Sequence, residues 1–241
     1  MQVCRNIMRP LLSPHTLFKS APAAGLKSFE PPVSFNEVEY PARQKLKIIH
    51  KVPQYPPSIR PYKTQKRLRL MRGPELFHNT LLHKQYGIIA LAGGRMKYCH
   101  FEMIRFTLLK RFDFKTGFAI WRVPEIWQPI SKKSQGARMG GGKGSIDHYV
   151  TPVKANQVIV EVGGPFEYFE VRKLLTNIAN KLPFRAIAVS QELMERQVEE
   201  KKKFKEENQN PFDWKYIIQN NIFGCHMWIS KYDRMWYNEY L

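Results

Sequence analysis

Residues 134–149 read Ser-Gln-Gly-Ala-Arg-Met-Gly-Gly-Gly-Lys-Gly-Ser-Ile-Asp-His-Tyr and form the most distinctive stretch of this chain. Five of the nine residues from 136 to 144 are glycine, and Arg138 and Lys143 lie among them. Because glycine accepts positive φ and carries no Cβ atom, such a stretch lets a partner approach the backbone closely. No carboxylate occurs in it before Asp147, so we expect the partner to be rich in phosphate.

This glycine stretch has three interpretations. The first is a flexible connection without a partner, since clusters of glycine are typical of loops. The second is a nucleotide-binding loop of the form G-x-x-x-x-G-K-[ST], in which amides and a lysine surround phosphates. That pattern fails, because Ala137 stands five residues before Gly142 and Gly144 follows Lys143. The third is a basic loop against a nucleic-acid backbone, and the charge of the rest of the chain favours it.

The 241 residues carry a formal net charge of +19, which is unevenly distributed. Residues 1–190 contain 31 basic and 11 acidic side chains, a net of +20, whereas residues 191–241 are close to neutral. Such an excess repels itself unless a polyanion is nearby. Nucleic acid is therefore the leading partner and an acidic membrane surface the lesser one. The chain has no apolar run long enough for a membrane-spanning helix, so we expect no membrane insertion.

The sequence predicts no metal site, no cofactor and no catalytic residue. Cys4, Cys99 and Cys225 are far apart, and none lies in a C-x-x-C or Cys/His pattern with zinc-ligand spacing. Asp147 and His148 are the one pair that suggests acid–base chemistry. Because adjacent residues on a strand point to opposite faces, we do not assign catalysis to them.

Composition divides the chain into four segments. Residues 1–29 are basic and have no acid, which is typical of an organellar transit peptide; the alternative is a basic arm that stays on the protein. Residues 30–73 are rich in proline and basic residues and are expected to form an extended arm. Residues 74–190 show the periodicity of a folded domain, and residues 191–241 read as a charged helix followed by an aromatic-rich extension.

The arm ends in a run of basic residues without any acid. A solvated surface normally mixes charges of both signs, so we expect this run to contact phosphates. Its six members are Arg60, Lys63, Lys66, Arg67, Arg69 and Arg72.

Hydrophobic periodicity predicts the elements of the central segment. They are a strand at 86–91, a helix at 98–112, a strand at 118–123, a loop at 125–145, a hairpin of 146–153 and 157–162, a helix from Pro165 to Leu182, and a strand at 184–189. Val158, Val160 and Val162 are expected on one face of their strand. The order predicts a small α+β domain with a mixed or antiparallel sheet and two helices.

The C-terminal extension is rich in aromatic residues. Trp228, Tyr232 and Trp236 have the spacing of one helical face. Two interpretations remain equally open for them. They fold back onto the domain, or they dock on a neighbouring protein, as aromatic anchors often do.

The segment from Ala137 to Tyr149 resembles the signature R-M-G-x-G-K-G of the large-subunit ribosomal protein L16 (uL16) family. Gly117–Val123 resembles the strand that precedes this loop in the family, and Gly94-Arg95 resembles its glycine–arginine pair before the first helix. The resemblance covers about residues 60–190. The basic N-terminal segment and the long tail are similar to the mitochondrial form. Bacterial relatives usually carry lysine where this chain has Gly141.

The resemblance implies an α/β-hammerhead fold and a structural role in the large mitochondrial ribosomal subunit. It implies binding of large-subunit rRNA near the aminoacyl-tRNA site and the peptidyl transferase centre, close to tRNA in the aminoacyl site. Support of tRNA accommodation and of late subunit assembly, and contacts of residues 191–241 with neighbouring large-subunit proteins, are further expectations. The alternative is a non-ribosomal RNA-binding or RNA-processing protein. The residues carried over are Arg138, Met139, Gly140, Gly142, Lys143 and Gly144 in the loop, with Arg95 before the first helix. Lys97 departs from the family's pattern and is an RNA-binding candidate because of its positive charge beside Arg95.

Overall fold

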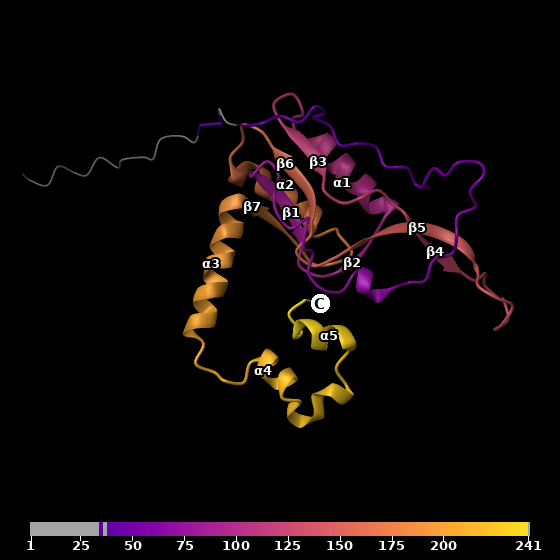
Figure 1. The fold of residues 1–241 in the computed structure, drawn as a ribbon. Helices are drawn as coiled ribbons and strands as arrows, with labels where there is room; N and C mark the ends of the chain where they lie inside the picture. The colour runs from indigo at the N-terminus through magenta and orange to yellow at the C-terminus, as the bar shows by residue number, and fades with distance from the viewer. Residues whose placement is uncertain (1–33, 36–37, 241) are drawn as a thin grey trace, which may run out of the picture. The chain divides into compact units, whose positions relative to one another are not determined.

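The computed structural model describes residues 34–35 and 38–240, so the transit peptide predicted at 1–29 lies outside the described residues. The elements that it describes follow in chain order (Figure 1). They are η2 (Leu68–Leu70), β1 (Tyr86–Ala90), β2 (Gly94–Lys97), α1 (Tyr98–Arg111), β3 (Phe118–Trp121), β4 (Gln128–Lys132), β5 (Ser145–Val153), β6 (Val158–Gly163), α2 (Tyr168–Ala179), β7 (Ala186–Ser190), α3 (Gln191–Glu207), α4 (Trp214–Gln219), η3 (Ile222–Met227) and α5 (Lys231–Trp236). The predicted α+β class with antiparallel sheets is confirmed.

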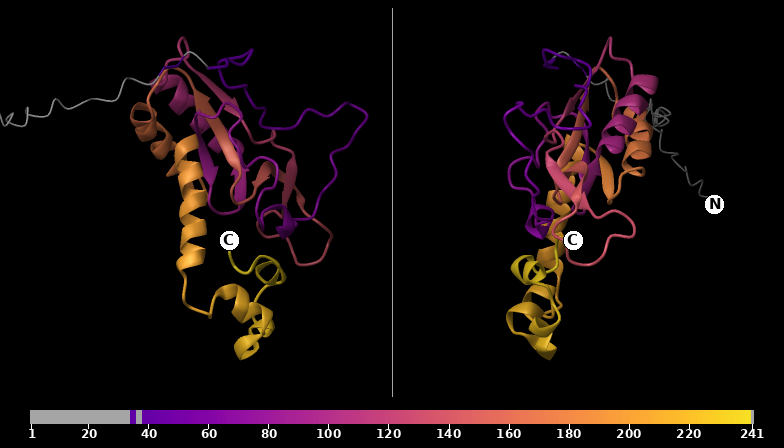
Figure 2. Two further views of the ribbon diagram at one scale, coloured as in Figure 1. Left: turned by 60° about the vertical axis from the view of Figure 1, so that its left-hand side comes forward. Right: turned by 90° about the vertical axis from the view of Figure 1, so that its right-hand side faces the viewer.

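The first sheet has the strand order β3-β6-β1-β7, and all its neighbours are antiparallel. Helices α1 and α2 pack against one face of it, as the right-hand view of Figure 2 shows. Phe101 and Ile104 of α1 and Ile178 of α2 are buried there against Ile88 and Val160. These apolar positions recur at helical spacing on one side of each helix, which is why both helices bury that side.

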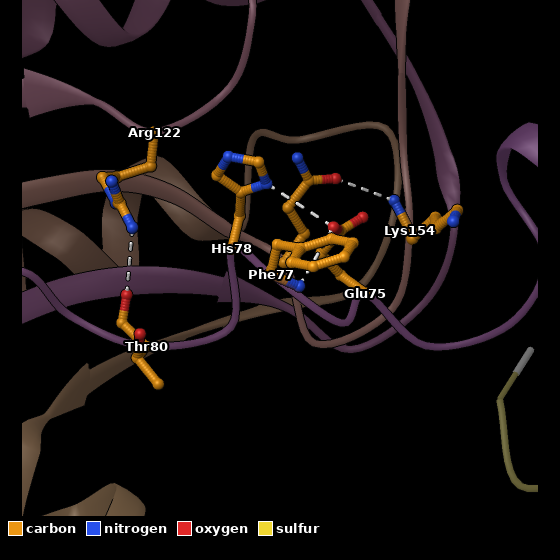
Figure 3. A network of polar contacts seen from close by, with 7 residues as sticks. Glu75, Phe77, His78, Thr80, Arg122 and Lys154 are labelled. Atoms are coloured by element: carbon orange, nitrogen blue, oxygen red, sulfur yellow. Dashed lines mark hydrogen bonds and ion pairs between the residues drawn. The ribbon is translucent and has the colours of Figure 1, made fainter.

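Residues 75–85 lie on the opposite face of the first sheet and are held by a buried carboxylate. The side chain of Glu161 is fully buried and accepts hydrogen bonds from the backbone amides of Leu82 (3.1 Å) and His83 (2.5 Å). The Nε atom of Arg122 lies 3.6 Å from the Glu161 carboxylate. The same guanidinium group donates a hydrogen bond to the Thr80 carbonyl at 3.4 Å (Figure 3). A buried charge is tolerated when it is paired in this way, so Glu161 fixes the path of the segment.

A β-bulge in β6 corrects one prediction. Ile88 pairs with Val160 but the next residue, Ile89, pairs with Val158, so Ile159 is an extra residue in β6. Val158 therefore packs with Ile89 on the face covered by residues 75–85, whereas Val160 packs on the helix-covered face. The expectation that Val158, Val160 and Val162 share one face is wrong, because a bulge shifts the alternation by one residue.

The second sheet has the order β2-β5-β4 and corrects two further predictions. The expected hairpin of 146–153 with 157–162 is wrong, because β5 pairs with β2 and β4 while β6 pairs with β1 and β3. The residues between them cross from one sheet to the other. The predicted loop at 125–145 is also too long, because its residues 128–132 form β4, an edge strand that carries Pro129.

The structure corrects the start of one predicted helix and adds a strand directly before the other. Helix α2 begins at Tyr168 rather than at Pro165, because Gly164 has φ of +148° and Glu167 is still extended. Helix α1 begins at Tyr98 as predicted, but it follows directly from the short strand β2, which the sequence did not indicate. Gly94-Arg95 therefore lies in a strand, and Lys97 is the last residue of that strand.

The arm is extended but partly built into the core. Leu46 and Ile49 are buried at 5% and 3% exposure. The Gln44 carbonyl accepts from the Ala119 amide at 2.9 Å, and the Lys47 carbonyl accepts from Trp121 Nε1 at 2.8 Å. The arm thus satisfies backbone groups at the edge formed by β3, a position that otherwise invites pairing with another chain.

The C-terminal extension breaks into short helices. Tyr232 and Trp236 stack within α5, with ring centroids 6.3 Å apart, but Trp228 lies outside that helix, so the predicted common helical face is wrong. Ser230 caps the start of α5 and is extended, with φ of −66° and ψ of 155°, so helical geometry is interrupted between Trp228 and Tyr232. Trp236 packs over Gly73, where a Cβ atom would lie 2.6 Å from its ring. This end of the extension therefore folds back onto the arm.

Candidate nucleic-acid interface

The glycine loop, residues 133–144, joins β4 to β5 and extends from the end of the second sheet (Figure 1). The two strands come together at its base, where Lys132 pairs with Ser145. A Cβ atom on Gly144 would lie 2.5 Å from the Lys132 carbonyl oxygen. Only glycine fits such an approach, so Gly144 closes the base of the loop.

The glycines at the loop tip have a different physical role. Gly140, Gly141 and Gly142 have φ of +92°, +60° and +80°, and a Cβ atom on any of them would meet nothing within 4 Å. Crowding within the described residues therefore does not explain them. Their left-handed backbone does, because this conformation costs other residues energy.

Arg138 and Met139 occupy the outer part of the loop, and both are exposed. Met139 has a relative exposure of 102%, more than any other large apolar side chain among the described residues. A cation beside a fully exposed apolar side chain has the composition of a contact surface. An arginine side chain can pair with a phosphate, and a methionine side chain is polarisable, apolar and able to adapt to irregular surfaces.

Lys63 and Lys143 lie side by side. The sequence pattern had assigned both of them to phosphate contacts. The Lys63 ammonium group donates to the Lys143 carbonyl at 3.1 Å, and the Lys143 ammonium group donates to the carbonyls of Lys63 (3.0 Å) and Thr64 (2.8 Å). The arm and the glycine loop, 80 residues apart in sequence, are therefore side by side. Figures 1 and 2 show this neighbourhood.

The other cations of the arm divide into two groups. Arg72 is half-buried and lies 3.8 Å from Asp233 of α5, so it faces the C-terminal extension. The remaining members are exposed and carry no ion pair within the described residues. They are Arg60, Lys66, Arg67 and Arg69.

Arg95 and Lys97 lie on β2, at the end of the second sheet away from the glycine loop. They pair with Pro152 and Val150 of β5. Lys97 is exposed, whereas Arg95 is half-buried and its Nε has no hydrogen-bond partner within the described residues. The structure therefore places the predicted site residues along one sheet and its flanking arm, rather than in a single pocket.

Asp147 and His148 contact each other, contrary to the expectation of opposite faces. His148 Nδ1 lies 2.7 Å from Asp147 Oδ2. The reason is a second β-bulge: Ile130 pairs with His148 and Ser131 with Ile146, which leaves Asp147 as the extra residue. The hydrogen bond with His148, together with Lys132 and Lys97, lowers the pKa of the exposed Asp147 carboxyl from its ordinary value. The carboxylate thus stays ionised beside these cations.

Metal-binding clusters and membrane-spanning helices are both absent from the described part of the chain. No cluster of three or more His, Cys, Asp or Glu side chains there is arranged to hold a metal ion. Among the same residues, no helix has the length and apolar character needed to cross a bilayer.

Two residues at the interface were missed by sequence reasoning. Lys133 donates to the Gly140 carbonyl at 2.6 Å across the glycine loop, and Thr64 supplies a carbonyl to Lys143. Both contacts depend on how the backbone folds. No pattern in the sequence marked either residue.

Comparison with known proteins agrees with this geometry. Residues 57–189 match the family described as Ribosomal protein L16p/L10e, a range that includes both sheets, the glycine loop and the basic run of the arm. The Large ribosomal subunit protein uL16 of Psychrobacter arcticus is 31% identical over 139 residues, which cover 56% of this chain and 99% of that protein. The protein of the same name from Psychrobacter cryohalolentis gives the same values. The chain thus belongs to the ribosomal protein L16p/L10e family.

Proposed function

We propose that this protein is a structural constituent of the large ribosomal subunit and binds large-subunit rRNA through the glycine loop and the basic arm. The observation that carries the proposal is the exposed pair Arg138–Met139 on a loop held beside the cationic arm. The relatives named above are large-subunit proteins, and they match this chain over nearly their whole length.

The proposed mechanism combines charge neutralisation with close backbone approach. Each arginine or lysine that meets a phosphate releases condensed counterions, so affinity should fall steeply with salt concentration. Gly140–Gly142 add no side chains to the loop, which lets its backbone enter a groove of folded RNA. Arg138 supplies the charge at the point of entry.

We further propose that the loop lies near the aminoacyl-tRNA site and the peptidyl transferase centre. In this position it would support tRNA accommodation and late subunit assembly. The resemblance of residues 137–149 to the family signature supports this placement. Residues 133–144 contain no histidine, cysteine, aspartate or glutamate, so the loop has no side chain suited to proton transfer near neutral pH. Its contribution is therefore shape and charge, and bond formation belongs to the RNA.

We propose a mitochondrial location from the composition of residues 1–29 and the two extensions beyond the family match. Residues 191–241 would then contact neighbouring large-subunit proteins. Phe223, Met227 and Trp228 support this, because they are 97%, 92% and 68% exposed. Exposed large apolar groups of this kind are typical of interaction surfaces.

Sedimentation of the tagged full-length protein from a mitochondrial lysate tests the proposal. We expect the protein in the large-subunit fractions and in intact ribosomes, and its release when the salt concentration is raised. Its presence with RNA in lighter fractions only would support the alternative of a non-ribosomal RNA-binding protein. Its absence from mitochondria would contradict the location.

A further inference from the structure

The ammonium groups of Lys63 and Lys143 each donate a hydrogen bond to the backbone carbonyl of the other residue. Three contacts join them and Thr64, at 3.1, 3.0 and 2.8 Å. Residues 61–67 belong to no helix or strand, so their carbonyl groups have no partner in a sheet ladder. The lysines supply donors to these carbonyls, and hydrogen bonds from charged donors are stronger than those between neutral groups.

A further hydrogen bond from a lysine to a backbone carbonyl lies on the side of the glycine loop that follows β4. Lys133 Nζ donates to the Gly140 carbonyl at 2.6 Å. Between these contacts, a Cβ atom on Gly140, Gly141 or Gly142 would meet nothing within 4 Å, so no packing restrains the tip of the loop. Glycine loses the most conformational freedom on ordering, so such a tip needs restraints from outside itself.

We propose that Lys63 and Lys143 are positioning residues, which together tie the glycine loop to the arm and so present Arg138 and Met139 to the RNA. Their ammonium groups face protein carbonyls, and they are not the phosphate ligands that the sequence pattern suggested. The RNA part of this inference rests on the proposed function. The loop-ordering part concerns the free protein alone. We call this pair of residues the lysine clamp.

The free full-length protein tests the clamp without RNA. The variants are K63M, K143M and the double variant, because methionine retains an unbranched apolar stem but removes the donor. The measured quantity is the rate of tryptic cleavage after Arg138, a site that all variants retain. K63M removes one of the three hydrogen bonds and K143M removes the other two, because every acceptor is a backbone carbonyl that the variants keep. We therefore expect K63M to increase this rate about tenfold, K143M to increase it further, and the double variant to increase it most.

Lys66 provides the matched control. It is an exposed arm lysine close to Lys63, and no hydrogen bond from it occurs within the described residues. K66M should leave cleavage after Arg138 unchanged. An unchanged rate in K63M would overturn the clamp, as would an equal rise in K66M.

Binding to a large-subunit rRNA transcript separates positioning from phosphate contact. For the clamp, K63M, K143M and the double variant should weaken binding in the same order in which they increase the cleavage rate, and the slope of log affinity against log salt should stay unchanged. Two phosphate ligands would instead lower that slope by about one for each lysine removed, which would overturn the inference. K66M should lower the slope by about one, because Lys66 belongs to the basic run that is expected to contact phosphates. If the wild-type protein did not bind the transcript, the proposed function would fail, and the cleavage rates alone would decide the clamp.

Discussion

The two sheets are both antiparallel, but they differ in how far they are buried. In the first sheet, β6 is buried at all six positions, with helices on one face and residues 75–85 on the other. In the second sheet, β5 is buried at four of the five positions from Tyr149 to Val153 and at none from Ser145 to His148. The first sheet thus provides stability, and the second carries an exposed loop away from that core. Substitutions in each sheet should therefore affect different measurements.

The largest expected effect is on stability, from Glu161→Ala in the first sheet. The change leaves Arg122 and the amides of Leu82 and His83 without their buried acceptor. We expect a loss of about 3–5 kcal/mol in the free energy of unfolding, measured by urea denaturation. Glu161→Gln retains one acceptor and should lose less. Equal stability of Glu161→Ala and the wild type would contradict the role given to this carboxylate.

The next effect concerns the arm at the edge of the first sheet. Leu46→Ala removes a buried side chain and should cost about 2–4 kcal/mol of unfolding free energy. Ile48→Ala is the control, because that side chain is 53% exposed and should change stability by less than about 0.5 kcal/mol. Similar values for both would mean that the arm does not pack as described.

The glycine loop contains glycines that are required for two different reasons, steric crowding at Gly144 and a left-handed backbone at Gly141. Gly144→Ala places a methyl group against the Lys132 carbonyl and should destabilise the protein by about 1–3 kcal/mol. Gly141→Ala meets no neighbour and should cost only about 1 kcal/mol, from its left-handed backbone. Thermal unfolding of the two variants gives the comparison. A larger loss for Gly141→Ala would reverse the two roles.

The smallest effect is a pH dependence at the start of α1. His100 Nδ1 accepts a hydrogen bond from the Lys97 amide at 3.0 Å, and burial, followed by the charge of Lys97, lowers the His100 pKa. The folded state therefore binds the proton that charges the His100 imidazole less tightly than the unfolded chain does. Stability from this site should be complete above the ordinary histidine value and decline as pH falls from there through the lowered pKa. An NMR titration that placed the His100 pKa above that of an unfolded reference would contradict this sign.

Much of the first sheet was predictable because its strands and helices have clear apolar periodicity. The strand at Tyr86, the helix at Tyr98 and the strand at Phe118 were predicted within a few residues. The second sheet was not predictable as a sheet, because strand pairing depends on contacts between distant residues. Strand β4 was hidden by Pro129 and by polar neighbours, and β2 is only four residues long.

The chemical character of the site was evident from the sequence, but its organisation was not. The sequence identified a basic glycine loop and a basic arm, since both are local patterns. It did not indicate that Lys63 and Lys143 meet, that Arg72 faces Asp233, or that Lys133 crosses the loop. These contacts join residues through backbone carbonyls or across long separations, and no local spacing encodes them. Two β-bulges likewise changed which side chains share a face.

Photo-crosslinking from position 139 tests the central claim most directly. A photoreactive residue in place of Met139, in ribosomes assembled in cells, should crosslink to large-subunit rRNA, whereas one in place of Phe223 in the C-terminal extension should crosslink to protein. Comparable sedimentation of both variants with the large subunit is the control for assembly. A protein that assembled normally but gave no RNA crosslink from position 139 would contradict the account.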